Sequence, residues 1–225
     1  MRKLSILSVL ITFWCVSVSS LAGVEIAGTR VIYNASDSQA TISVYNPDSR
    51  PYLIQSWVAR DVDSLDNDET FITTPPLFRL EPKSQNSVRI VLKRPPQINN
   101  KESVYWLNIK SIPATDKPQS NVLYIAVKNR MKLFYRPQGL QGNSNSAYQE
   151  LNVIRRGSQL FLRNPTSYSV SFFDFRINGR KLDAITMILP GQELPVAQSP
   201  ASATITWRSI NDMGGLNEMQ SRTGQ

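Results

Sequence analysis

The alternation of apolar and polar positions along this chain predicts β-strands and no long helix. Short runs with apolar side chains at every second residue recur from end to end, and no helical period persists. Prolines and asparagines separate these runs, a pattern typical of an all-β sandwich. The strands predicted before Pro137 are Ala40–Tyr45, Tyr52–Ala59, Ser87–Leu92, Val104–Ile112 and Asn121–Val127.

The composition changes after Pro137. Residues 138–147 are rich in glycine, serine, asparagine and glutamine, which is linker composition. Three more strands are predicted beyond it, at Gln159–Arg163, Ser169–Ile177 and Ala203–Ile210, and Asn178-Gly179 is a strong hairpin signal. The sequence therefore predicts two β-sandwich domains, residues 23–140 and 141–225.

The first 22 residues have the pattern of a secretory signal peptide. Arg2 and Lys3 precede an apolar run, and small residues at positions 20 and 22 predict cleavage after Ala22. The run is short for a membrane span, so we expect an exported protein without stable membrane anchoring. Cleavage would remove 22 of the 225 residues and leave 203. The only cysteine, Cys15, is among the residues removed. The mature chain then has no disulfide and no thiolate chemistry.

Charge and residue types narrow the possible functions. The formal net charge of +8 falls to +6 when Arg2 and Lys3 are removed. This moderate balance suits an acidic protein or the cell envelope, and no basic stripe interleaved with aromatics points to nucleic acid. The chain has no histidine, which excludes Ser-His-Asp sites and nearly all zinc sites. Carboxylate pairs remain, so a glycosidase is the enzyme alternative that composition leaves open.

The acidic run Asp61–Glu69 is a weak candidate for a calcium loop. An EF-hand loop needs oxygen ligands at alternate positions and a glycine at the sixth. Here Leu65 and Asp66 take the fifth and sixth positions. We therefore interpret the run as a solvated loop and expect no metal and no cofactor.

An ordered set of motifs resembles the periplasmic pilus chaperones of the PapD and FimC type. The matching segments are Gly28–Tyr33 (GTRVIY), Thr74–Pro82 (TPPLFRLEP), Glu102–Ile112 (ESVYWLNIKSI), Lys132–Pro137 (KLFYRP) and Asn211–Gly215 (NDMGG). The resemblance implies two immunoglobulin-like domains in an L or boomerang arrangement with a cleft between them. The final residues, Leu216–Gln225, lack strand alternation, so whether the second domain is complete stays open.

The resemblance implies that Arg30 and Lys132 hold the C-terminal carboxylate of a pilin subunit. The chemistry is sound, because arginine can bind a carboxylate with two parallel hydrogen bonds and lysine adds a point charge. The alternative is that both are ordinary surface cations. The other cations of this stretch, Lys128 and Arg130, are expected to be solvated.

The resemblance also implies that strand 121–127 completes the fold of the subunit. Leu123, Ile125 and Val127 alternate on one face and would fill the groove of an incomplete sandwich. The alternative is that these side chains pack in their own domain's core. Because Lys132 has the opposite parity, we predict a bulge or another irregularity between Val127 and Lys132 if all of them serve one cleft.

A charged trio is expected at the hinge. By motif, Glu102, Arg136 and Asp212 match residues that link the domains in the family. The expectation fails if Arg136 lies more than about 6 Å from both carboxylates, since charge coupling in water is weak at such distances.

The sequence thus predicts a periplasmic chaperone that passes pilin subunits to an outer-membrane usher, without any chemical step. The short segment Pro113–Ser120 resembles the short-loop subclass of the family. Self-association of the free protein through its exposed strand is a further possibility. The rival is a carbohydrate- or envelope-binding sandwich with an aromatic platform, but its candidates, Trp57, Trp106 and Trp207, lie at strand positions that favour core packing.

Overall fold

The computed structural model describes residues 23–62, 64, 68–97, 99–114, 125–198 and 203–224. The predicted signal peptide, much of the acidic run, Leu123 and most of the short loop therefore lie outside the described residues. Within the described ranges, no helix is long and apolar enough to cross a membrane.

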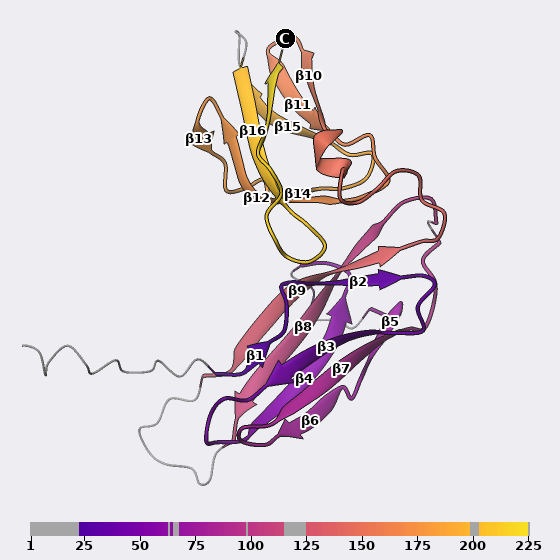
Figure 1. Cartoon of the computed structure of the whole chain (residues 1–225), viewed down its shortest axis with the longest axis vertical. Coiled ribbons are helices and arrows are strands. Elements are labelled where there is room, and N and C mark those ends of the chain that lie inside the picture. The colour runs from indigo at the N-terminus through magenta and orange to yellow at the C-terminus, as the bar shows by residue number, and fades with distance from the viewer. Residues whose placement is uncertain are drawn as a thin grey trace, which may run out of the picture.

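The first domain consists of two packed sheets (Figure 1). Its strands are β1 (Glu25–Ile26), β2 (Arg30–Asn34), β3 (Ala40–Tyr45), β4 (Tyr52–Ala59), β5 (Phe71–Thr74), β6 (Leu77–Leu80), β7 (Gln85–Leu92), β8 (Ser103–Pro113) and β9 (Val127–Arg136). One sheet has the order β1-β3-β7-β5 and the other β2-β9-β8-β4-β6. All neighbouring strands are antiparallel except β2 and β9, which are parallel.

The core of this domain follows from the period of two along its strands. Ile42 and Val44 on β3 are 3% and 0% exposed, whereas Thr41 is exposed and Ser43, between them, is half-buried. On β9 the odd-numbered Met131, Leu133 and Tyr135 belong to the same cluster. Successive side chains of a strand point to opposite faces, so one apolar face of each sheet is enough to fill the interior.

The second domain is a smaller sandwich of the same kind. Its elements are a 3-10 turn, η2 (Ala147–Gln149), and the strands β10 (Asn152–Arg156), β11 (Gln159–Arg163), β12 (Val170–Ile177), β13 (Arg180–Lys181), β14 (Met187–Ile188), β15 (Glu193–Gln198), β16 (Ala203–Ile210) and β17 (Gln220–Gly224). The sheets have the orders β10-β11-β15 and β13-β12-β16-β17, and β14 pairs with β12. Asn178 and Gly179 both have positive φ, 49° and 80°, as expected for a tight hairpin turn between β12 and β13.

The end of the chain forms a strand, although its sequence lacks the alternation typical of one. Residues 216–225 lack strand alternation, yet β17 pairs with β16 from Ala203↔Gly224 to Trp207↔Gln220. The side chains of Ser221, Arg222 and Thr223 are all exposed, so this edge strand has no need of an apolar face. A Cβ atom on Gly224 would lie only 2.7 Å from Leu160, so glycine lets this backbone approach the core closely.

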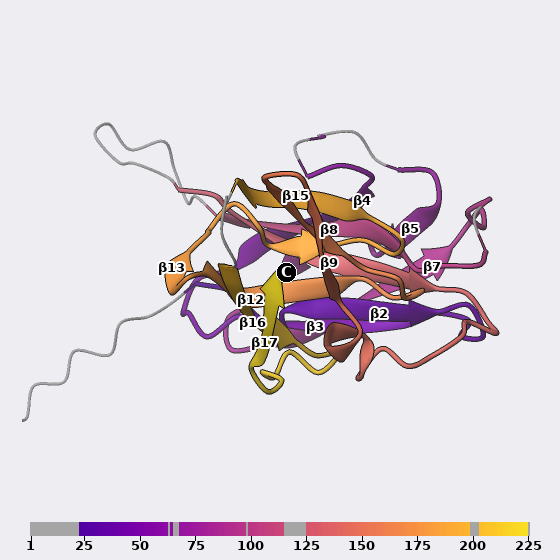
Figure 2. The ribbon, with the colours of Figure 1, turned by 90° about the horizontal axis from the view of Figure 1, so that it is seen from above.

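The two domains have separate cores and meet at a narrow junction. The first buried cluster ends at Tyr135 and the second begins at Ala147, with the predicted linker between them. Figure 1 shows the second domain standing on one end of the first, with the β16–β17 loop reaching down to it. In this loop, a Cβ atom on Gly214 would lie 2.9 Å from the Thr29 hydroxyl. Seen from above, the strands of the two domains cross (Figure 2).

Candidate functional site

Strand β9 begins at Val127, so it overlaps the predicted strand Asn121–Val127 at that residue only, and it runs through the charged stretch that was expected to follow the strand. It pairs with β8 without a break from Ser111↔Val127 to Ser103↔Tyr135. The irregularity predicted between Val127 and Lys132 is therefore wrong, and these two side chains point to opposite faces of the sheet, which counts against the expectation that they serve one cleft from the same face. The charged stretch 128–136 is the body of a strand, whose cations lie on its outer face.

The second edge of β9 is covered along only half of its length. Strand β2 pairs with it from Arg30↔Lys132 to Asn34↔Arg136. No strand of the described ranges pairs with the other half, Val127–Met131, on this side, and we call that half the free edge. A neighbour can pair with the free edge in the plane of the sheet, so a shared site does not require Val127 and Lys132 to face the same way.

Of the predicted donor residues, Val127 is the first residue of β9, Ile125 lies two residues before the strand, and Leu123 is outside the described residues. Ile125 is 65% exposed and Val127 is 50% exposed, so the alternative that they pack in their own core is wrong for both. They border an open hollow of about 310 Å³ together with Val24 and Tyr52. Exposed β-branched side chains beside an unpaired edge are features that soluble proteins usually avoid.

Arg30 and Lys132 line a hollow of about 510 Å³ between the two domains, which we call the interdomain cleft. The Lys132 ammonium donates a hydrogen bond to the Ser171 hydroxyl at 3.0 Å, and the Arg30 Nη1 donates to the Ile210 carbonyl at 3.1 Å. The Nε atom of Arg30 is buried without an acceptor among the described residues. An ammonium has three N–H donors and a guanidinium five, so both cations have more donors than these bonds use.

Burial and mutual repulsion set the protonation of these cations. Loss of solvent and then the charge of Arg30 lower the pKa of Lys132 to about 8. Burial also lowers the pKa of Arg30, which Asp212 and Glu102 partly oppose. A carboxylate placed between two such cations would be favoured by both, because the site is partly removed from water.

The cleft also has apolar walls and a third cation, which sequence reasoning missed. Its remaining lining residues are Thr29, Trp106, Arg130, Met131, Phe173, Ile210, Gly214 and Leu216. Arg130 is half-buried here, contrary to the expectation of a fully solvated charge. Phe173 is 58% exposed, next to the point where the pairing of β12 with β16 shifts register. The even parity of Arg130 and Lys132 was the available signal for a shared face.

The tryptophans do not form an exposed platform. Trp207 is 1% exposed and donates its indole N–H to the Tyr148 carbonyl. Core packing was predicted for all three, but it is wrong for Trp57 and Trp106, which are half-buried on the outer face of their sheet. Ser56 and Leu107, their neighbours in sequence, face inward instead.

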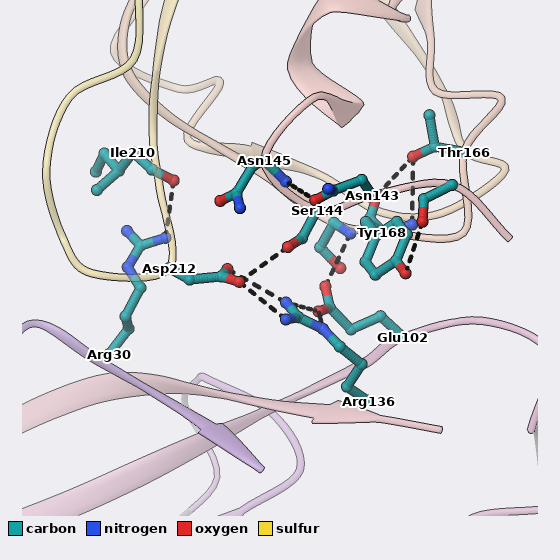
Figure 3. A network of polar contacts seen from close by, with 12 residues as sticks. Arg30, Glu102, Arg136, Asn143, Ser144, Asn145, Thr166, Tyr168, Ile210 and Asp212 are labelled. Atoms are coloured by element: carbon teal, nitrogen blue, oxygen red, sulfur yellow. Dashed lines mark hydrogen bonds and ion pairs between the residues drawn. The ribbon is translucent and has the colours of Figure 1, made fainter. Parts of the chain in front are cut away.

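Behind the cleft, Arg136 contacts both carboxylates of the predicted trio (Figure 3). Its guanidinium lies 2.8 Å from Glu102 and 2.8 Å from Asp212, well inside the 6 Å limit. Glu102 belongs to the first domain and Asp212 to the second. The Ser144 hydroxyl donates to Asp212 at 2.9 Å, and the Ser169 backbone N–H donates to Glu102 at 2.8 Å.

The two carboxylates of the trio differ in burial. The Glu102 side chain is 1% exposed and burial raises its pKa, although Arg136 opposes the shift. The Asp212 side chain is 31% exposed. Burial raises its pKa too and is the largest single cause, but the hydrogen bonds and charge of Arg136, with smaller contributions from Ser144 and Arg30, together bring the pKa below its ordinary value. The guanidinium therefore compensates one fully buried charge and one accessible charge.

Comparison with known proteins gives matches over both domains. Residues 23–141 match the model "Pili and flagellar-assembly chaperone, PapD N-terminal domain", and residues 146–221 match "Pili assembly chaperone PapD, C-terminal domain". The probable fimbrial chaperone LpfB of Escherichia coli O157:H7 is 40% identical over 205 residues, covering 88% of this chain and 87% of that protein. Chaperone protein FimC of E. coli K12 is 38% identical over 199 residues, covering 87% and 82%.

Solved structures agree with the sequence matches. One is that of the SafA pilin of Salmonella enterica in complex with the SafB chaperone, with 29% identity, a TM-score of 0.79 and coverage of 91% of this chain and 97% of that chain. Another is the periplasmic chaperone SfaE, with 35% identity, a TM-score of 0.75 and coverage of 88% and 98%.

Proposed function

The chain belongs to the PapD family of pilus-assembly chaperones, and we propose that it binds pilin subunits in the periplasm and delivers them to an outer-membrane usher. Its action is reversible protein binding without a chemical step or a cofactor. Export through the signal peptide, with cleavage after Ala22, is part of this proposal. So are the limits of the two domains, 23–140 and 141–225, and self-association of the free protein through its exposed strand.

The observation that carries the proposal is the position of the two cations at the end of the free edge. Strand β2 is parallel to β9 and begins at Arg30, opposite Lys132. A subunit strand that pairs with Val127–Met131 in the same direction would continue the line of β2 and end where Arg30 begins. Its terminal carboxylate would then lie between Arg30 and Lys132.

This arrangement suits a partner recognised without regard to most of its sequence. Every subunit carries a terminal carboxylate, and the free edge offers backbone groups that pair with any strand. Specificity then comes from alternate side chains: Ile125 and Val127, together with Leu123 outside the described residues, would fill the apolar groove of an incomplete subunit. Covering that groove would also prevent subunits from pairing with one another prematurely.

The Glu102–Arg136–Asp212 trio would set the angle between the domains. Support comes from its contacts, since one guanidinium pairs with a carboxylate of each domain. Because Lys132 and Arg136 share the outer face of β9, a shift of the second domain at this junction would alter the cleft as well.

The experiment is co-expression with the pilins encoded nearby, comparing Lys132→Ala with Lys128→Ala. Truncation of a partly buried charge partner should weaken pilin complexes by about a hundredfold or more. Lys128 has an exposed side chain on the same face of the same strand and serves as the matched control. Recovery of equally stable complexes with Lys132→Ala would overturn the carboxylate anchor.

A further inference from the structure

The two cations of the cleft meet two acceptors of the second domain in a matched arrangement. Arg30 and Lys132 are direct neighbours across β2 and β9. Ser171 and Ile210, which accept their hydrogen bonds, are direct neighbours across β12 and β16. Strands β2 and β9 of the first domain are thus joined to β16 and β12 of the second by two side-by-side hydrogen bonds.

Ser171 is an unusual residue for its place in the fold. Its side chain is 2% exposed on a strand whose neighbours Val170 and Phe172 are both buried and apolar. A buried hydroxyl without a partner is costly, and among the described residues this hydroxyl is hydrogen-bonded by Lys132 alone. The position would suit an apolar side chain equally well if packing alone mattered.

Lys132 needs such a partner, because no negative charge holds its ammonium. The charged side chains that line the cleft with it are Arg30 on β2 and Arg130 on β9, and no carboxylate of the described residues lines this hollow. A flexible lysine side chain repelled by Arg30 would turn away from the cleft in the absence of an acceptor on the far wall. Ser171 supplies this acceptor.

We propose that Ser171 is a positioning residue of the carboxylate site, so that the site is completed by the second domain. This inference rests on the proposed function. A lysine ammonium has three donors, and the bond to Ser171 uses one of them. Arg30 likewise donates from Nη1 to the Ile210 carbonyl, and a guanidinium has five N–H donors, so this bond uses only one of them. Both cations can therefore bind a subunit carboxylate while they are hydrogen-bonded to the second domain. The affinity for the carboxylate then depends on the position of that domain.

The test measures discrimination between a carboxylate and its neutral analogue. The probe is a synthetic peptide of about eight residues with alternating apolar side chains, long enough to cover the free edge, with either a free or an amidated C-terminus. Wild type should prefer the free acid. Ser171→Ala should weaken binding of the acid by about tenfold, as expected for a hydrogen bond to a charged group, and leave the amide unchanged. Ser171→Thr should restore the preference.

Ser209→Ala is the matched control, since Ser209 is a buried serine on the adjacent strand whose hydroxyl accepts a hydrogen bond from Asn217. It should not alter the ratio between acid and amide. Equal loss for both peptides in Ser171→Ala would mean a merely structural role and would overturn the inference. The inference would also be overturned if Ser171→Ala left the ratio of acid to amide binding unchanged while Lys132→Ala abolished the preference for the acid.

Failure of the proposed carboxylate anchor would give a different result from failure of the Ser171 inference. If wild type binds both peptides equally or binds neither, the carboxylate anchor fails. The positioning role is then decided in the free protein by NMR titration of the Lys132 ammonium. Ser171→Ala should lower the pKa of Lys132, because the charged form loses an acceptor, and Ser171→Thr should restore it. An unchanged titration contradicts the inference.

Discussion

The two halves of strand β9 share one regular ladder with β8 and differ on their other edge. In the half Val127–Met131, no described strand covers this edge, and Val127 is exposed. In the half from Lys132 to Arg136, strand β2 covers it, and Leu133 and Phe134 are buried. The same strand is thus open to a partner at one end and built into the protein at the other.

The difference arises from the chain before β2. Strand β1 pairs with β3 in one sheet, whereas β2 pairs with β9 in the other. Gly28 lies between them with a φ of 112°, a conformation that side chains disfavour. Because the chain changes sheets here, β2 begins late and leaves five residues of β9 uncovered. A binding edge can therefore be made by displacing a neighbour, without any change in the strand itself.

The largest expected effect is a loss of stability from a substitution in the half of β9 that β2 covers. Arg136→Ala should lower the free energy of unfolding by about 3–5 kcal/mol, because Glu102 would remain buried without a cation. Chemical denaturation measures the change. Arg79→Ala is the control, since Arg79 pairs with Glu81 on the surface and should cost about 0–1 kcal/mol. Equal losses for the two variants would show that the trio does not compensate a buried charge.

A second comparison uses two side chains on the same face of β9. Leu133 is 0% exposed, and Leu133→Ala should cost about 2–5 kcal/mol of stability through the cavity it leaves. Val127→Ala should change stability by less than about 0.5 kcal/mol, since half of this side chain is already in solvent. A large loss for Val127→Ala would mean that the start of β9 belongs to the core.

The smallest expected effect is the pH dependence of subunit binding. Lys132 binds a carboxylate only as an ammonium, and its pKa in the free protein is about 8. The affinity for the subunit should be highest well below this pKa. It should fall by about tenfold between pH 7 and pH 9, because the protonated fraction of Lys132 falls by this factor. Lys132→Arg should remove this dependence, because arginine stays charged. A flat profile for wild type would contradict a role for the Lys132 ammonium.

The family and seven strands, β3, β4, β7, β8, β11, β12 and β16, could be predicted from the sequence, whereas the other strands, most of them two to five residues long, were missed. The bounds of β3, β4, β11 and β16 are those expected from alternation alone, and the Asn178-Gly179 hairpin follows from residues that tolerate positive φ. These features depend on neighbours within a few residues. The motifs around Arg30, Lys132 and Arg136 selected these three residues, but not Arg130 or Phe173, which also line the cleft.

What the sequence determined by itself is the strands with clear alternation and the residue types of Arg30, Lys132 and the charged trio, since both are local. The tertiary structure decided which edge of β9 stays free, that Arg130 and Trp106 line the cleft, and that β17 closes the second domain without an apolar face. It also brought Ser171 to Lys132 across 39 positions of the chain. A period of two says that side chains alternate, but which face is buried and which edge is covered depends on strands that are distant in sequence.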